Sequence, residues 1–262
     1  MLIVPRFLNA CALSPNGSSS IFKQAREHLQ AEHGVDVTLL QVPNDSCENN
    51  GKLIAKYLRQ HAHDGKKYIV IGYSKGAADL QLALQDGAAA SVVAAHISVA
   101  GAVRGSPLAD LSAGRALVEK PEASLGCMAQ LGPALQSLRG DGRRAFVASH
   151  PRPSVFSYSL VTASRLSDTS RALRATRWLL GAGLQPEDGV LVAADGILPG
   201  AKFLGTARAD HVAVAQNFQQ TALSGLFNKN HFPHTALIEA LLRFVIADLG
   251  GASAPEGGSP HQ

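Results

Sequence analysis

The stretch from Tyr68 to Gln85 constrains the fold of this chain more than any other. A short apolar, β-rich run leads into Gly72-Tyr-Ser-Lys-Gly76, and an alanine-rich run typical of a helix follows. When a Gly-x-Ser-x-Gly sequence connects a strand to a helix, the turn is too tight for a side chain at either glycine. Ser74 would then be held at the carboxyl edge of a sheet, above helix N–H groups that suit a developing negative charge. The alternative is an ordinary strand-to-helix loop in which Ser74 only caps the helix.

Strand patterns and helix patterns alternate along the chain. Apolar strand-like runs lie at residues 2–4, 35–42, 68–71, 94–100, 154–162 and 201–204. Helical patterns lie at residues 21–32 and 77–85, and further helices are expected to begin near Ser46, Ser167 and Pro233. Short connections with right-handed crossovers favour an α/β fold, with a mostly parallel central sheet and helices on both faces.

The pattern predicts one domain over residues 1–249. Within it, residues 104–150 have a looser pattern, with short helical runs inside 123–138 and a polar, glycine-rich run at 139–144. We expect this segment to form a cap or lid over the site, or else a loose surface insertion. Residues 250–262 have little to bury and are expected to form a disordered tail.

Composition limits the kinds of partner that the protein could bind and the cellular compartment in which we expect it. The net charge is +4, and the arginines carry no interleaved aromatic side chains, so we expect no nucleic-acid partner. A basic surface allows peripheral lipid contact or an acidic substrate, although a solvated face is the plainer interpretation. No apolar run reaches the roughly 18 residues that span a bilayer. The start, Met1 to Pro5, lacks the basic region of a signal peptide, so we expect a cytoplasmic protein, with secretion by another route left open.

Cysteine and histidine spacing gives no sign of a metal site or of a disulfide framework. Cys11, Cys47 and Cys127 are unevenly spaced, with no C-x-x-C, and are expected to be reduced thiols. His231 and His234 have no carboxylate cluster beside them and are expected to flank the last helix.

A nucleophilic Ser74 would need a base, and that base would need an orienting carboxylate. In this architecture the chain order is serine, acid, histidine. His211 follows the last expected strand in a loop from which an imidazole can reach over the turn at Ser74, whereas His150 precedes the strand at 154–162 and is out of order.

Two aspartates compete for the role of the acid. Asp188 and Asp195 each precede a glycine, so each is expected in a turn where a carboxylate could point across to an imidazole. At least one of them must be an ordinary turn residue. Asp210 is expected to point away from its neighbour His211 and to be exposed.

These motifs resemble those of the α/β-hydrolase superfamily, and within it the bacterial lipase/esterase-like branch. The resemblance rests on Gly72-Tyr-Ser-Lys-Gly76, Asp188-Gly-Val-Leu191 and Asp210-His211, and on Arg104 to Asp110 as a loop after the fourth strand. It spans nearly the whole chain apart from the tail. In that branch the acid sits in an Asp-Gly-x-Val motif, which favours Asp188 over Asp195.

The sequence departs from this family after the first strand, where His-Gly or Pro-Gly is usual and Pro5-Arg6-Phe7 stands instead. By position, the backbone N–H groups of Phe7 and Lys75 would hold the oxyanion. Arg6 could obstruct that arrangement, and losing one such donor costs about 3 kcal/mol of transition-state stabilisation.

The resemblance implies a serine hydrolase of carboxylic, lipid-like esters that needs no cofactor and no metal. Ser74 would attack, His211 would carry the proton, Asp188 would orient the imidazole, and the product would form through an acyl-enzyme. An acyltransferase or thioesterase could use the same triad. A non-catalytic α/β-hydrolase-like binding protein is the alternative that Arg6 supports, and the separation of His211 from Ser74 discriminates the two. A nucleotide-binding enzyme is disfavoured because no phosphate-loop motif is present.

Overall fold

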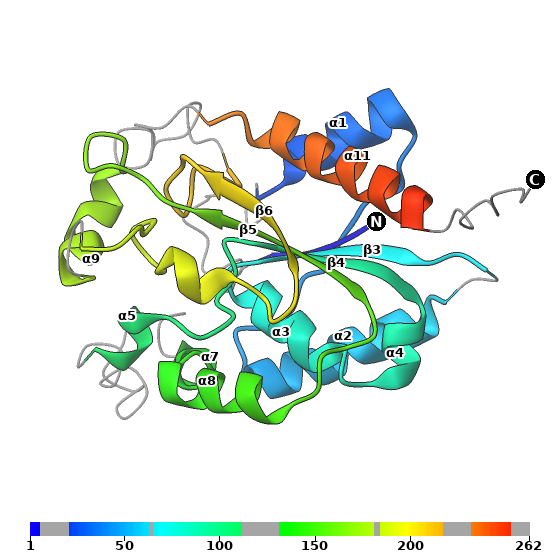
Figure 1. The fold of residues 1–262 in the computed structure, drawn as a ribbon, viewed down its shortest axis with the longest axis horizontal. Coiled ribbons are helices and arrows are strands. Elements are labelled where there is room, and N and C mark those ends of the chain that lie inside the picture. Colours follow the sequence, from blue (N-terminus) through cyan, green and yellow to red (C-terminus); the bar gives the residue numbers. More distant parts are fainter. Residues whose placement is uncertain (6–20, 63–64, 112–130, 181–183, 217–231, 253–262) are drawn as a thin grey trace, which may run out of the picture.

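The computed structural model describes residues 1–5, 21–62, 65–111, 131–180, 184–216 and 232–252 of the 262-residue chain (Figure 1). Its centre is a six-stranded sheet with the strand order β2-β1-β3-β4-β5-β6. The strands are β1 (Leu2–Val4), β2 (Thr38–Leu39), β3 (Tyr68–Tyr73), β4 (Val93–Val99), β5 (Phe156–Thr162) and β6 (Lys202–Ala207). Each pairing between neighbouring strands is parallel, so the carboxyl ends of the strands meet at one edge of the sheet.

Helices cover both faces of this sheet, as α/β folds require (Figure 1). Helices α1 (Lys23–His33) and α11 (His234–Ala252) lie side by side on one face. The other face carries α2 (Cys47–Gln60), α3 (Lys75–Ala83), α4 (Gly87–Ser91), α7 (Gly132–Ser137) and α8 (Gly140–Ser149). The remaining short helices are α5 (Pro107–Asp110), η3 (Arg171–Leu173), α9 (Arg174–Leu179) and η4 (Ala193–Gly196).

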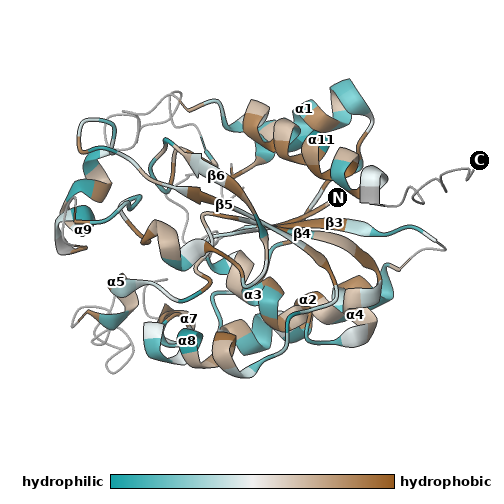
Figure 2. Ribbon diagram, viewed as in Figure 1, coloured by the Kyte–Doolittle hydropathy of each residue, from teal (hydrophilic) through white to brown (hydrophobic). Residues whose placement is uncertain are grey.

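The core divides into two layers because side chains of a strand alternate between its faces. Ile3 packs in the cluster that includes helices α1 and α11, whereas Leu2 and Val4 pack in the cluster that includes α2 and α3. Apolar residues are accordingly concentrated along the strands and on the inner sides of the helices (Figure 2). The predicted α/β fold with a mostly parallel sheet is confirmed.

Three boundaries differ from the sequence predictions. Strand β2 has two residues instead of the run 35–42, because its single neighbour β1 is itself only three residues long. The helical pattern near Ser167 becomes η3 and α9, which begin at Arg171. Helix α11 extends to Ala252 and so includes the start of the tail expected at residues 250–262, of which 253–262 lie outside the described residues.

The run at 139–144 was expected to be an irregular part of the insertion, but it begins helix α8. The reason is tertiary. The buried Arg143 guanidinium donates hydrogen bonds to the Val103 carbonyl at 3.2 Å and to the Gln81 side chain at 2.5 Å, and this anchors the helix against α3 despite its two glycines. Helices α7 and α8 of the expected cap thus lie in the helical layer beside α2 and α3. Residues 112–130 lie outside the described residues, so a cap over the site stays a prediction for them.

Candidate active site

Ser74 occupies a strained turn between strand β3 and helix α3. Its backbone angles are φ 56° and ψ −124°, a region that L-residues with a side chain rarely adopt. A Cβ atom on Gly72 would lie 2.5 Å from the Cα atom of Ala77, and one on Gly76 would lie 2.1 Å from the carbonyl oxygen of Val4. The two glycines are therefore required by contacts with backbone atoms, as the sequence pattern indicated. The turn aims Ser74 at the carboxyl edge of the sheet.

Three residues that lie far apart in the sequence form a hydrogen-bonded chain at this edge. The Nε2 atom of His211 lies 2.8 Å from the Ser74 Oγ atom, and its Nδ1 atom lies 2.8 Å from the Oδ2 atom of Asp188. All three side chains are buried. The carboxylate can only accept a hydrogen bond, so the His211 ring carries its hydrogen on Nδ1 and presents the Nε2 lone pair to the serine hydroxyl.

Asp188 sits in a tight turn that satisfies both of its oxygens. Its Oδ1 atom accepts hydrogen bonds from the backbone N–H groups of Val190 at 3.0 Å and Leu191 at 2.8 Å, and its Oδ2 atom also accepts one from the Thr162 hydroxyl at the end of β5. These contacts fix the carboxylate in the orientation that meets His211. Asp195, the competing aspartate, lies in η4, where its carbonyl accepts from the Arg104 N–H. The structure therefore brings Asp188 to the imidazole, and Asp195 is a turn residue.

The loop that carries His211 is tied down by Asp210, and here the sequence expectation was wrong. Asp210 is fully buried rather than exposed. It accepts hydrogen bonds from the N–H groups of Val212 and Ala213 at 3.0 and 2.8 Å, and from the backbone and hydroxyl of Ser170. The short side chain folds back onto its own loop, so it points away from the imidazole but into the protein.

Tyr73 is a site residue that the sequence did not single out. Its ring stacks on the His211 ring with centroids 5.2 Å apart, and its hydroxyl donates to the His211 carbonyl. The aromatic residue before a nucleophile turn gives a weak signal, because apolar residues are common there. The contacts of Tyr73 with the His211 ring and backbone become visible only in the folded structure.

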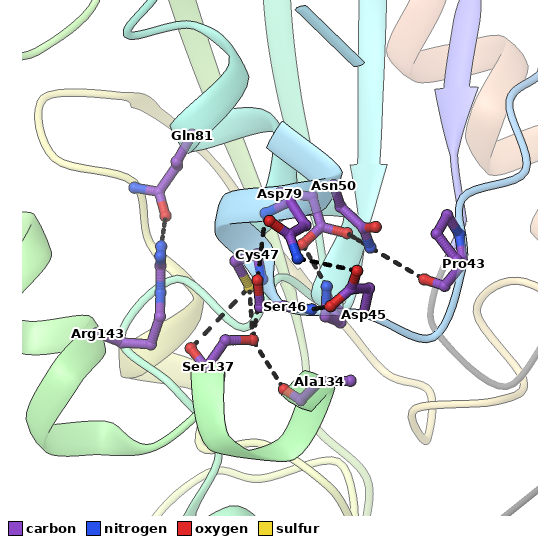
Figure 3. Close-up of polar contacts among 12 residues, drawn as sticks. Pro43, Asp45, Ser46, Cys47, Asn50, Asp79, Gln81, Ala134, Ser137 and Arg143 are labelled. Carbon is purple, nitrogen blue, oxygen red and sulfur yellow. Dashed lines mark hydrogen bonds and ion pairs between the residues drawn. The ribbon is translucent and has the colours of Figure 1, made fainter. Parts of the chain in front are cut away.

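Helix α3 begins with a buried charge pair directly behind the serine. The Lys75 ammonium group lies 2.6 Å from Asp79 Oδ1, and both side chains are fully buried. Asp79 Oδ2 also accepts from the Asn50 amide at 3.1 Å, in a polar network that continues through Cys47 and Ser137 (Figure 3). Burial raises the pKa of Asp79, whereas Lys75 opposes that rise. Burial also raises the pKa of the free Cys47 thiol to about 12, so it is neutral at physiological pH and not a competing nucleophile.

The other predicted residues fall into two groups. His150 is the C-cap residue after helix α8, exposed and with its ring stacked on Phe146. His234 is the buried first residue of α11. Neither is brought to Ser74. Arg6, Phe7, Cys11, Cys127 and His231 lie outside the described residues.

Comparison with solved structures gives a consistent picture. The chain is 32% identical to the metagenomic carboxyl esterase MGS0156 over 94% of this chain and 75% of that one, with a TM-score of 0.83. The mature lipase BlEst2 of Bacillus licheniformis is 22% identical over 93% and 91% of the two chains, with a TM-score of 0.64. The metagenome-derived lipolytic enzymes LipS and LipT show the same fold at 14% identity, a coverage of 94% and 92%, and a TM-score of 0.54. No protein-family model matches the chain, and no curated protein does.

The parallel sheet and the likeness to MGS0156 define the class of this protein. The chain belongs to the α/β-hydrolase superfamily, among its esterase- and lipase-like enzymes. Within the described ranges, no helix is both long enough and apolar enough to cross a bilayer.

Proposed function

We propose that this chain is a serine hydrolase that cleaves carboxylic, lipid-like esters through an acyl-enzyme. The observation that carries the proposal is the hydrogen-bonded chain Ser74–His211–Asp188 at the strained turn. Its chain order and its two 2.8 Å contacts suit a nucleophile, a base and an orienting acid. The carboxyl esterase activity named for MGS0156 supports the choice of substrate class.

In the first half of the reaction, Ser74 Oγ attacks the acyl carbonyl while its proton passes to Nε2 of His211. The imidazolium that forms is stabilised by the buried carboxylate of Asp188, which also keeps the ring from turning. The same proton then passes to the leaving alcohol oxygen as the acyl–oxygen bond breaks. The result is an acyl group on Ser74 and a neutral His211 that is ready for the second half.

The negative charge on the carbonyl oxygen needs donors that are already in place. Lys75 is the first residue of helix α3, so its backbone N–H has no acceptor within the helix and can meet that oxygen. The ion pair with Asp79 fixes the Lys75 side chain and so helps to hold this N–H in position. Phe7 N–H is the proposed second donor, although Phe7 lies outside the described residues.

In the second half, water gives a proton to His211 and attacks the acyl carbonyl, and Ser74 leaves with that proton. A different acceptor in place of water would make the enzyme an acyltransferase. A thioesterase would differ only in its leaving group, a thiol in place of the alcohol. The lipid-like preference rests on the resemblance of the motifs to those of bacterial lipases.

The test is labelling with a fluorophosphonate probe, which reacts only with an activated serine. Wild type should be labelled, whereas Ser74→Ala and His211→Ala should not, with circular dichroism as the check on folding. A p-nitrophenyl ester series from short to long acyl chains then determines the acyl preference, with matched thioesters and alcohol acceptors as separate arms. A folded wild type that stays unlabelled would overturn the proposal in favour of a binding protein.

A further inference from the structure

Two histidines and a glutamate meet between helices α1 and α11, which lie side by side (Figure 1). The Nε2 atom of His28 lies 2.7 Å from Glu239 Oε2, and the Nε2 atom of His33 lies 2.9 Å from Glu239 Oε1. All the donor atoms lie within 4.8 Å of one another. Within the described ranges this is the one group of three or more His, Cys, Asp or Glu side chains that converges in this way.

The donor set is the kind that borderline transition metals prefer. Two imidazole nitrogens and one carboxylate oxygen bind zinc, whereas calcium and magnesium favour oxygen ligands alone. The three side chains are 34%, 29% and 21% exposed, which leaves a path for a cation and a water as fourth ligand.

The three side chains are close enough to bind one zinc ion after their ligand atoms adjust. Ligands that bind zinc tetrahedrally at about 2.0–2.1 Å stand about 3.3 Å apart. For an ion bound at Oε2, the His28 Nε2 atom, now 2.7 Å from that oxygen, would move away by roughly half an ångström. The His33 Nε2 atom, now 2.9 Å from Oε1, would turn toward the same ion. To bind the ion, each ring would carry its hydrogen on Nδ1 and offer the lone pair of Nε2.

Arg243, one turn after Glu239, provides support from behind the ligands. Its guanidinium lies 2.7 Å from Glu239 Oε1. Because Arg243 and His33 both contact Oε1, the oxygen left for a cation is Oε2, whose present hydrogen bond with His28 the ion would replace. A hydrogen-bond donor on the other oxygen of a ligating carboxylate is common in metal sites.

We propose that His28, His33 and Glu239 form a zinc site that joins α1 to α11 on the face of the sheet opposite α3. The site has a structural role, because it links helices from the two ends of the chain and lies apart from Ser74. Bound zinc would hold the two helices together and raise the thermal stability of the protein.

The experiment uses the full chain, freed of any affinity tag and stripped with EDTA. Titration calorimetry should give one zinc ion per chain with a dissociation constant on the order of micromolar, and no saturable binding of calcium or magnesium. At about 100 times that constant, zinc should raise the melting temperature by roughly 5 °C. His33→Ala and Glu239→Gln should weaken binding by at least about tenfold and abolish the shift.

His61→Ala is the matched control, since it removes an exposed imidazole at the end of helix α2 and should leave zinc binding unchanged. Each variant is compared with itself with and without zinc, so a loss of basal stability does not confuse the result. X-ray absorption of zinc-loaded wild type should show two imidazole ligands and needs no variant. Absence of saturable zinc binding, or binding by both variants as tight as in wild type, would overturn the proposal.

Discussion

Two buried histidines, His211 and His96, lie in different surroundings although each side chain is only 2% exposed. His211 has a partner on each ring nitrogen, Asp188 on one side and Ser74 on the other. His96 lies within strand β4, and among the described residues its Nε2 atom has no hydrogen-bond partner. Burial lowers the pKa of His96 to about 4, so this ring stays neutral at physiological pH.

Burial alone therefore weakens proton binding by an imidazole, as the lowered pKa of His96 illustrates. What can make a buried ring into a base is the carboxylate behind it, because that charge stabilises the protonated form. Asp188 is that carboxylate for His211, whereas no carboxylate among the described residues is found to contact His96. Four substitutions, each at one of these histidines or at a residue that holds His211, test this contrast.

The largest effect is expected when His211 loses its carboxylate. Asp188→Asn should lower kcat by about 10⁴-fold, because the neutral amide neither fixes the tautomer nor stabilises the imidazolium. The measurement is ester hydrolysis with a substrate chosen from the chain-length series. Asp195→Asn is the control and should retain activity near that of wild type. Equal losses in both variants would refute the assignment of Asp188.

The next effect concerns His96 and the pH dependence of stability. Its folded pKa of about 4 lies below the ordinary 6.5, so between these values the unfolded chain binds the proton and the folded chain does not. Stability from this group is therefore full above pH 6.5 and falls as the pH drops toward 4, by about 3 kcal/mol. Urea unfolding of wild type and His96→Leu should show this loss only in wild type.

The exposed His61 again offers a control, because His61→Leu should leave the acid-dependent loss in place. If His96→Leu shows the same acid-dependent loss as wild type, then His96 does not cause it, and the contrast with His211 fails.

A smaller effect is expected when the loop of His211 loses its anchor. Asp210→Asn removes the charge that accepts hydrogen bonds from Ser170 and the loop N–H groups, so we expect a loss of about 2 kcal/mol in unfolding free energy. Activity should fall by roughly tenfold, because the imidazole is less well positioned. Asp168→Asn, which breaks an exposed pair with Arg208, should cost less than about 1 kcal/mol and no activity.

The smallest effect is expected for Tyr73→Phe. The ring that stacks on His211 remains, and only the hydroxyl that donates to the His211 carbonyl is lost. One neutral hydrogen bond of this kind contributes about 1 kcal/mol, so kcat should fall by less than about tenfold. A loss as large as that of Asp188→Asn would mean that Tyr73 takes part in the chemistry itself.

Sequence patterns predicted the features of this protein that depend on residues close together in the chain. Gly72 and Gly76 are required by contacts with nearby backbone atoms, so the turn at Ser74 can be recognised from the residue pattern alone. The strands β1, β3, β4 and β5 followed from short apolar runs, and the N-cap at Ser46 from its residue type, which accepts from the Asn49 N–H. The resemblance to lipases and esterases placed Asp188 ahead of Asp195.

The features that the sequence could not predict depend on distant partners. Helix α8 forms because Arg143 reaches Gln81 and Val103, and Asp210 is buried because Ser170 meets it from another loop. Neither contact produces a periodicity or a residue spacing in the sequence by which it could be predicted. The same holds for His28 and His33, whose convergence on Glu239 exists only once α1 and α11 are docked.

The division of the candidate site along the chain has a consequence for refolding. Ser74 belongs to a turn built from β1, β3 and α3, whereas Asp188 and His211 arrive only with the segments after β5 and β6. Each strand joins by a parallel pairing across a long connection, which is the slow kind of contact to form. Recovered catalysis would therefore report the docking of the last strands, and it should lag behind the return of helical circular dichroism.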